Sequence, residues 1–120
     1  MTAQPYRRGD VIRVNLNPVV GSEQANTRPC IVMSEPDTAR SSGARLLYVI
    51  VPLTRSASLR GDTAPRIEQR PGGLPSDSTA LCLHVRSIDP KRVLGYVGSL
   101  GASEYEPVSR GLGVLLGLTS

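Results

Sequence analysis

The stretch Leu46-Leu-Tyr-Val-Ile-Val-Pro-Leu53 is the most apolar run in the chain. It carries no charge, and three β-branched residues follow one another at its centre, Val49 to Val51. A short apolar run that is rich in β-branched residues and lies between polar segments is typical of a strand buried on both faces. We therefore expect a central strand at 46–53, with the other elements arranged around it.

The segments on either side of this run alternate apolar and polar residues. Asp10-Val-Ile-Arg-Val-Asn-Leu16 is the clearest case, and Asn17-Pro18 ends it. Alternation with a period of two indicates strands with one buried face. The pattern predicts further strands at 10–16, 29–34, 64–68, 79–87 and 94–100. Polar segments rich in Gly, Pro and Ser predict loops or turns at 17–28, 35–45, 54–63 and 71–77.

A helix is expected at the C-terminal end of the sequence. Ser103-Glu-Tyr-Glu106 matches the capping box that begins many helices. The expected apolar face of this helix is formed by Val108, Leu112, Leu115, Leu116 and Leu118. Gly111, Gly113 and Gly117 weaken the helix by about 1 kcal/mol each relative to alanine, so it needs tertiary or partner contacts. Residues 88–92 resemble one helical turn, and we expect a mainly β (β-rich α+β) fold in a single domain over 1–120.

Composition and charge narrow the classes of protein to consider. The chain contains no Phe and no Trp, so its core must be aliphatic. Cys30 and Cys82 lie in apolar runs, which indicates buried free thiols in a cytoplasmic protein. No Cys-x-x-Cys or Cys/His cluster, apolar stretch of membrane-spanning length or secretory signal is visible in the sequence. The net charge of +4 and the pI near 9.6 favour an anionic partner such as nucleic acid.

An ordered series of short motifs resembles the MazF/PemK family of toxin endoribonucleases. The motifs are Arg8-Gly-Asp-Val11, Leu16-Asn-Pro18, Gly21-Ser-Glu-Gln24, Arg28-Pro29, Val51-Pro-Leu-Thr54, Val85-Arg-Ser-Ile-Asp89, Arg92 and Val97-Gly98. The resemblance implies an SH3-like twisted antiparallel barrel with helices packed on it. It also implies a homodimer with an RNA groove across both subunits, and a cognate antitoxin whose extended acidic tail occupies that groove.

Three residues are candidates for catalysis through this resemblance. Arg28 could clamp a phosphate and stabilise negative charge, although a solvated loop arginine is the structural alternative. Thr54 could donate to a phosphate oxygen, or simply form a Ser/Thr turn after its strand. Glu23 could act as a general base if its pKa is raised, or it could pair with Arg28, which would lower that pKa.

Other residues are candidates for binding RNA. They are Ser22 and Gln24 in the first loop, Arg55 after the central strand, and His84 and Arg86 in the segment 79–87. His84 is the only histidine and stands where relatives often carry Gln, so it could contact a base or transfer a proton; we favour the contact. Further positive charge for a groove is expected from Arg60, Arg66 and Arg70.

The activity that the resemblance implies is cleavage of single-stranded RNA at short sequence motifs, leaving a 2′,3′-cyclic phosphate and a 5′-hydroxyl. The substrate supplies its own nucleophile, so no metal ion or cofactor is expected. Two other classes stay open from the sequence: a barrel that binds RNA without cutting it, and a toxin of the same fold that binds a protein such as a gyrase-like target.

Overall fold

The most apolar run of the sequence forms β3 (Tyr48–Thr54), which lies in the interior of the sheet. The computed structural model describes residues 5–17, 26–35 and 47–118. Within β3 the four residues from Ile50 to Leu53 are buried. The strand is flanked by β2 on one side, and on the other side by β6 and then β5. The expected central strand is confirmed.

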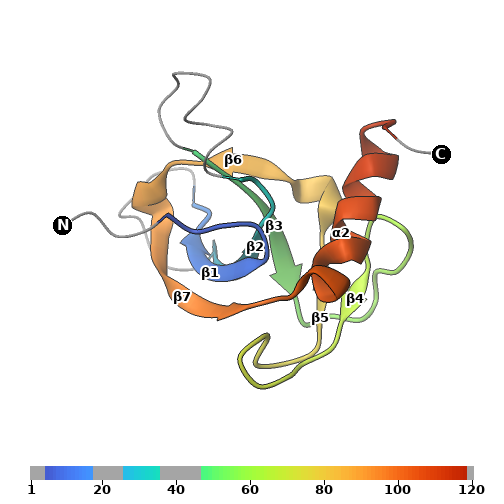
Figure 1. Cartoon of the computed structure of the whole chain (residues 1–120), viewed down its shortest axis with the longest axis horizontal. Coiled ribbons are helices and arrows are strands. Elements are labelled where there is room, and N and C mark those ends of the chain that lie inside the picture. The colour runs from blue at the N-terminus through green and yellow to red at the C-terminus, as the bar shows by residue number, and fades with distance from the viewer. Residues whose placement is uncertain (1–4, 18–25, 36–46, 119–120) are drawn as a thin grey trace.

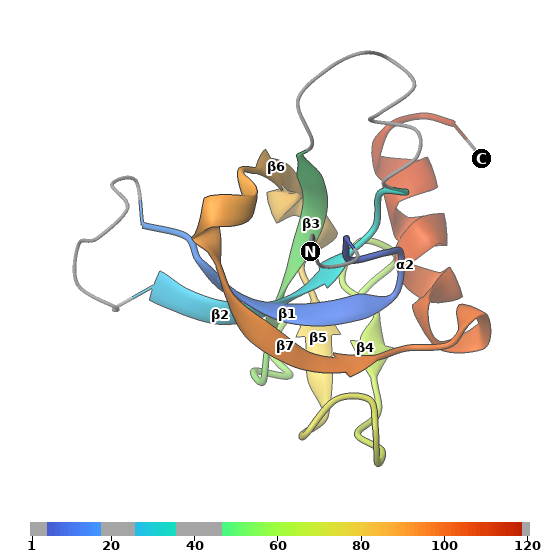
Figure 2. The ribbon, with the colours of Figure 1, turned by 60° about the vertical axis from the view of Figure 1, so that its left-hand side comes forward.

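The strands of the described chain form one antiparallel sheet with the order β4-β5-β3-β2-β1-β7, and β6 pairs with β3 outside this path (Figure 1). The strands other than β3 are β1 (Asp10–Asn15), β2 (Thr27–Val32), β4 (Arg66–Ile67), β5 (Ser78–Ala80), β6 (Arg86–Ile88) and β7 (Val93–Ser99). Figure 2 shows β7, β1 and β2 side by side and strongly twisted. This confirms the mainly β, twisted antiparallel architecture, although the strand expected at 64–68 covers only two residues.

The sheet curls so far that its two ends meet. The turn after β4 packs on β7, where the Ser99 amide donates to the Gly72 carbonyl at 2.9 Å. A Cβ atom on Gly98 would lie 2.3 Å from the carbonyl oxygen of Gly73, so only glycine allows the two backbones to approach this closely. Both faces of β1 are buried as a result: Val11 belongs to one apolar cluster, and Ile12 belongs to the other.

The prediction of a single strand at 79–87 is wrong, because the structure divides this segment into two strands and a turn between them. β5 ends at Ala80, a 3₁₀ turn, η2 (Cys82–His84), follows, and β6 begins at Arg86. The break lies opposite Pro52, whose carbonyl accepts from the Leu81 amide at 2.9 Å. In an antiparallel ladder the residues of a hydrogen-bonded pair exchange two bonds, but Pro52 has no N–H to return to Leu81. The ladder is therefore interrupted here and the chain leaves the sheet for one turn.

The C-terminal helix, α2 (Ala102–Leu115), begins before the expected capping box. Its N-cap is Gly101, whose amide donates to the Glu104 carboxylate at 2.9 Å. Of the expected apolar face, Val108 is buried and Leu112 packs against the core. The prediction is wrong for Leu116 and Leu118, whose side chains are 61% and 76% exposed. Both residues follow the end of the helix. The expected helical turn is η3 (Pro90–Arg92), which starts after β6.

Both cysteines are free and buried, as expected. Cys30 lies in β2, whereas Cys82 lies in η2 and not in a strand. Within the described ranges, no helix is long and apolar enough to cross a membrane.

Candidate functional site

β2 and β3 bring Arg28 and Thr54 to one place on the surface. Cys30 pairs with Pro52 in the antiparallel register, and extending this register by two residues sets Arg28 beside Thr54. Both residues are half-buried and line a hollow of about 490 Å³, together with Arg55 and Pro75. Arg28 thus lies within β2 and not at the end of a loop, so its backbone is fixed by the sheet.

A second hollow of about 340 Å³ adjoins the first, because Arg28 lines both. Its other walls include Leu16, Pro52, His84 and Arg86. His84 reaches this position because η2 carries it out of the sheet opposite Pro52. The two hollows therefore collect the expected residues Arg28, Thr54, Arg55, His84 and Arg86 into one continuous, largely basic surface.

Asn26 is a neighbour of Arg28 that the sequence reasoning missed. Its side-chain oxygen Oδ1 accepts from Arg28 Nε at 3.4 Å, and its carbonyl accepts from the Leu16 amide at 3.0 Å. An arginine that is held through Nε can still present its terminal amino groups to a phosphate. The only available signal was the spacing, since residues two apart lie on the same face of an extended chain.

Of the two roles weighed for Thr54, the structure shows the turn, and the turn leaves the other role open. Its Oγ1 accepts from the Ser56 amide at 3.2 Å, which is the Ser/Thr turn expected as the structural alternative. The bond uses a lone pair of the hydroxyl oxygen, and the hydroxyl proton can still be donated. A turn that fixes the oxygen and a donor that meets a phosphate are therefore compatible.

The positive charges of the site influence the pKa of the buried Cys30 thiol in β2. Burial raises the pKa of this thiol from 9.0 to about 12, and the positive charges of Arg28 and Arg86 act in the opposite direction. Both guanidinium groups are thus close enough to influence the same atom. Two positive charges that close together suit an anionic ligand.

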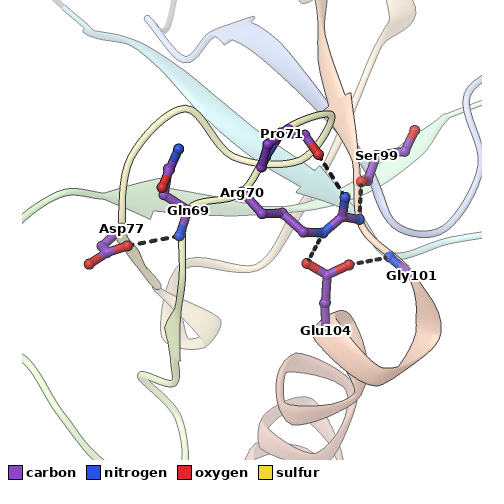
Figure 3. A network of polar contacts seen from close by, with 7 residues as sticks. All are labelled: Gln69, Arg70, Pro71, Asp77, Ser99, Gly101 and Glu104. Carbon is purple, nitrogen blue, oxygen red and sulfur yellow. Dashed lines mark hydrogen bonds and ion pairs between the residues drawn. The ribbon is translucent and has the colours of Figure 1, made fainter.

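Two of the arginines expected in the groove are used elsewhere. Arg70 donates to the Glu104 carboxylate at 2.5 Å and to the Ser99 carbonyl at 3.0 Å, which ties the turn after β4 to the start of α2 (Figure 3). Arg66 donates to backbone carbonyls of the loop after β3. Arg60 lines a separate hollow with Leu59 and Leu83, which also reaches His84.

Some expected residues lie outside the described part of the chain. These are Ser22, Glu23 and Gln24, so the choice between Glu23 as a base and Glu23 as a partner of Arg28 stays open. Among the described residues, no group of three His, Cys, Asp or Glu side chains is arranged to hold a metal ion.

Comparison with known proteins gives one consistent family. Residues 7–116 match the model described as a PemK-like, MazF-like toxin of type II toxin-antitoxin systems. The chain is 32% identical over 117 residues to endoribonuclease MazF9 of Mycobacterium tuberculosis, covering 95% of this chain and 98% of that protein. It is 31% identical over 112 residues to endoribonuclease EndoA of Bacillus subtilis, covering 93% and 95%. A crystal structure of MazF from Deinococcus radiodurans is similar with a TM-score of 0.73 at 25% identity, covering 96% and 99%.

Proposed function

The chain belongs to the PemK-like, MazF-like family of type II toxins, and from this premise we propose that it is an endoribonuclease that cuts single-stranded RNA at short sequence motifs. The observation that carries the proposal is the convergence of Arg28 and Thr54 on one hollow. They are two of the three residues that the family resemblance suggests for catalysis, and the third, Glu23, lies outside the described residues. The relatives named as endoribonucleases cover nearly the whole chain, which supports the same activity.

The proposed reaction is an attack by the 2′-hydroxyl of the RNA on its own phosphate. The 2′-oxygen forms a bond to phosphorus while the bond from phosphorus to the 5′-oxygen breaks, which leaves a 2′,3′-cyclic phosphate. The 2′-hydroxyl gives up its proton to a base, and the departing 5′-oxygen gains one. Arg28 stabilises the charge of the phosphorane, and Thr54 donates to a phosphate oxygen and aligns it. Glu23 remains the proposed base.

The rest of the surface fits a role in binding. Arg55 in the first hollow and Arg86 in the second contact the RNA backbone, and His84, which also lines the second hollow, contacts a base. Ser22 and Gln24 are proposed to contact the RNA as well. A cognate antitoxin with an extended acidic tail would occupy the same basic surface. The protein would act as a homodimer whose groove continues across both subunits, and it would act in the cytoplasm.

The test is to incubate the pure protein with end-labelled RNA of mixed sequence in EDTA. We expect complete cleavage at a small set of sites, with 2′,3′-cyclic phosphate ends. Loss of cleavage in EDTA and its return with Mg²⁺ would overturn the metal-independent mechanism. RNA binding without cleavage under both conditions would indicate a binding protein.

The nucleophile is tested separately by replacing the 2′-hydroxyl at one mapped site with hydrogen. The substituted site should stay intact while the RNA still binds with similar affinity. Cleavage at the deoxy site at the parental rate would exclude attack by the ribose.

A further inference from the structure

Ser56, the second residue after β3, is held by hydrogen bonds through both of its backbone polar groups. Its carbonyl accepts from Arg66 Nη1 at 3.2 Å and from the Thr79 hydroxyl at 3.0 Å. Its amide donates to the hydroxyl oxygen of Thr54 at 3.2 Å. The two peptide groups that flank Ser56 are thereby fixed, although the side chains of the loop that follows are exposed to solvent.

The sheet itself builds this arrangement. Thr79 of β5 pairs with Thr54 of β3 on one side and with Arg66 of β4 on the other, so the three residues form a row across neighbouring strands. Thr79 is completely buried, and its hydroxyl accepts from Arg66 Nη1 at 2.9 Å while it donates to Ser56. The same Nη1 also donates to the Arg55 carbonyl at 3.1 Å.

Nη1 of Arg66, an exposed residue, is therefore occupied by acceptors that belong to the protein. A free cation on the rim of a groove would face solvent and meet phosphates, whereas Arg66 crosses β5 to bind the loop. A buried threonine needs a partner for its hydroxyl, and both of its bonds here serve the same loop. Their combined effect reaches Thr54 through the Ser56 amide, which fixes the hydroxyl oxygen and leaves its proton to donate.

We propose that Arg66 and Thr79 are positioning residues for Thr54. This inference rests on the proposed cleavage reaction. The two residues act through Ser56 and touch no RNA: they hold the Thr54 hydroxyl where it meets the scissile phosphate. A misplacement of a positioned group by about 1 Å lowers a reaction rate by about 10²-fold.

Thr79 offers a matched pair of variants for the test. Thr79→Val removes the hydroxyl at nearly constant size, and Thr79→Ser retains it. We expect kcat for a mapped RNA site to fall between about 10-fold and 100-fold in Thr79→Val and in Arg66→Ala, and to stay near the parental value in Thr79→Ser. KM and the salt dependence of RNA binding should not change. Arg110→Ala is the control, since this arginine is paired with Glu106 within α2 and lines neither hollow.

The route through Thr54 is tested in the Thr54→Ala background. There, Arg66→Ala should cause no further loss of kcat, because the hydroxyl that it positions is gone. A full additional loss in this background would overturn the proposal. So would a raised KM with a salt slope that is flatter by about 0.7 in Arg66→Ala, which is the signature of a lost phosphate contact.

An independent measurement follows the loop and not the activity. Hydrogen exchange of the Ser56 amide should become faster in Arg66→Ala and in Thr79→Val than in the parental protein. Unchanged exchange would overturn the proposed linkage whatever the rates. The two proposals fail in different ways: a parental protein that does not cut RNA overturns the proposed function, whereas a parental protein that cuts and an Arg66→Ala variant with the same kcat overturn this inference alone.

Discussion

Arg28 and Thr54 place two unlike donors on one hollow, and their expected contributions differ. A guanidinium stabilises charge that develops in the transition state, and removing one such donor typically lowers kcat by about 10²–10³-fold. We expect kcat to decrease by this factor in Arg28→Ala and by a smaller factor in Thr54→Ala. Since the proposed mechanism has both acting on one phosphate, the double variant should lose less than the product of the two single losses. Single-turnover cleavage of a mapped RNA site measures all three.

The control for Arg28 must separate charge from geometry and activity from folding. Arg28→Lys keeps the charge but lacks the planar fork that binds a phosphate through two bonds, so it should be severely impaired as well. Because Arg28 lies in β2, each variant also needs a thermal unfolding curve beside the rate. A folded Arg28→Ala protein that cuts RNA at the parental rate would remove Arg28 from the mechanism.

Cys30 makes a prediction about stability and pH. Burial raises the pKa of its thiol from 9.0 to about 12, so the folded protein keeps a proton that the unfolded chain loses near pH 9. The sign follows: the contribution is fully present below pH 9 and is lost as the pH rises from there toward 12. Each pH unit in this window lowers the free energy of unfolding by up to about 1.4 kcal/mol for this thiol.

Urea unfolding at pH 8 to 10.5 measures this effect. Cys82, whose pKa burial raises to about 11, contributes in the same direction. Cys30→Ala should therefore show a shallower decline of stability with pH than the parental protein, whatever its stability at pH 8. Equal slopes in the two proteins would contradict the assignment to Cys30.

For Gly111 in α2, intrinsic helix propensity and tertiary packing predict opposite effects of an alanine substitution on stability. A Cβ atom on Gly111 would lie 2.5 Å from the Asp62 carbonyl oxygen and 2.9 Å from Cys82 Sγ. Propensity alone predicts that Gly111→Ala stabilises the helix by about 1 kcal/mol. We expect the opposite sign, because overpacking a close contact costs about 1–3 kcal/mol. Ser103→Ala is the control: the N-cap is Gly101, so this change should stay within about 0.5 kcal/mol. Chemical denaturation that shows a stabilised Gly111→Ala would contradict the packing.

The elements that the sequence predicted well are those with a clear hydrophobic period. The strand near 10–16 and the central run form where their apolar residues are buried by the curled sheet, and a strand also forms near 94–100, although Leu94 and Tyr96 in it are 47% and 58% exposed. The break at η2 was missed because the segment 79–87 alternates regularly by itself. Its cause is Pro52, which lies on another strand and withholds a hydrogen bond only once the two chains are paired. Similarly, the helix begins where the Glu104 carboxylate accepts from the Gly101 amide. The predicted start was two residues later, because Ser103-Glu-Tyr-Glu106 matches a capping box by itself.

For the whole molecule, the sequence predicted which residues carry charge but not which charges remain available. Five arginines were expected near the groove. The side chains of Arg66 and Arg70 are bound to acceptors within the protein, and apart from the Pro71 carbonyl these acceptors lie 10 or more residues away in sequence. Asn26 was missed for a related reason, because a polar residue beside a loop has no distinctive pattern. Such tertiary hydrogen bonds follow from the fold and have no local signal.

The remaining charges lead to a prediction about salt and competition. With a net charge of +4 and a basic surface over two adjoining hollows, binding of single-stranded RNA should weaken with salt by a slope of about −0.7 per phosphate neutralised. Arg55→Ala and Arg86→Ala should each flatten the slope by about 0.7, while Arg110→Ala, whose charge is paired with Glu106 on α2, should not.

An acidic peptide should compete for the same surface, so raising its concentration should raise the apparent dissociation constant of RNA in proportion. Fluorescence anisotropy of a labelled, uncleavable deoxy-substituted RNA measures both effects. If RNA and the acidic peptide bind together without mutual loss of affinity, the shared basic surface is not the site of one of them.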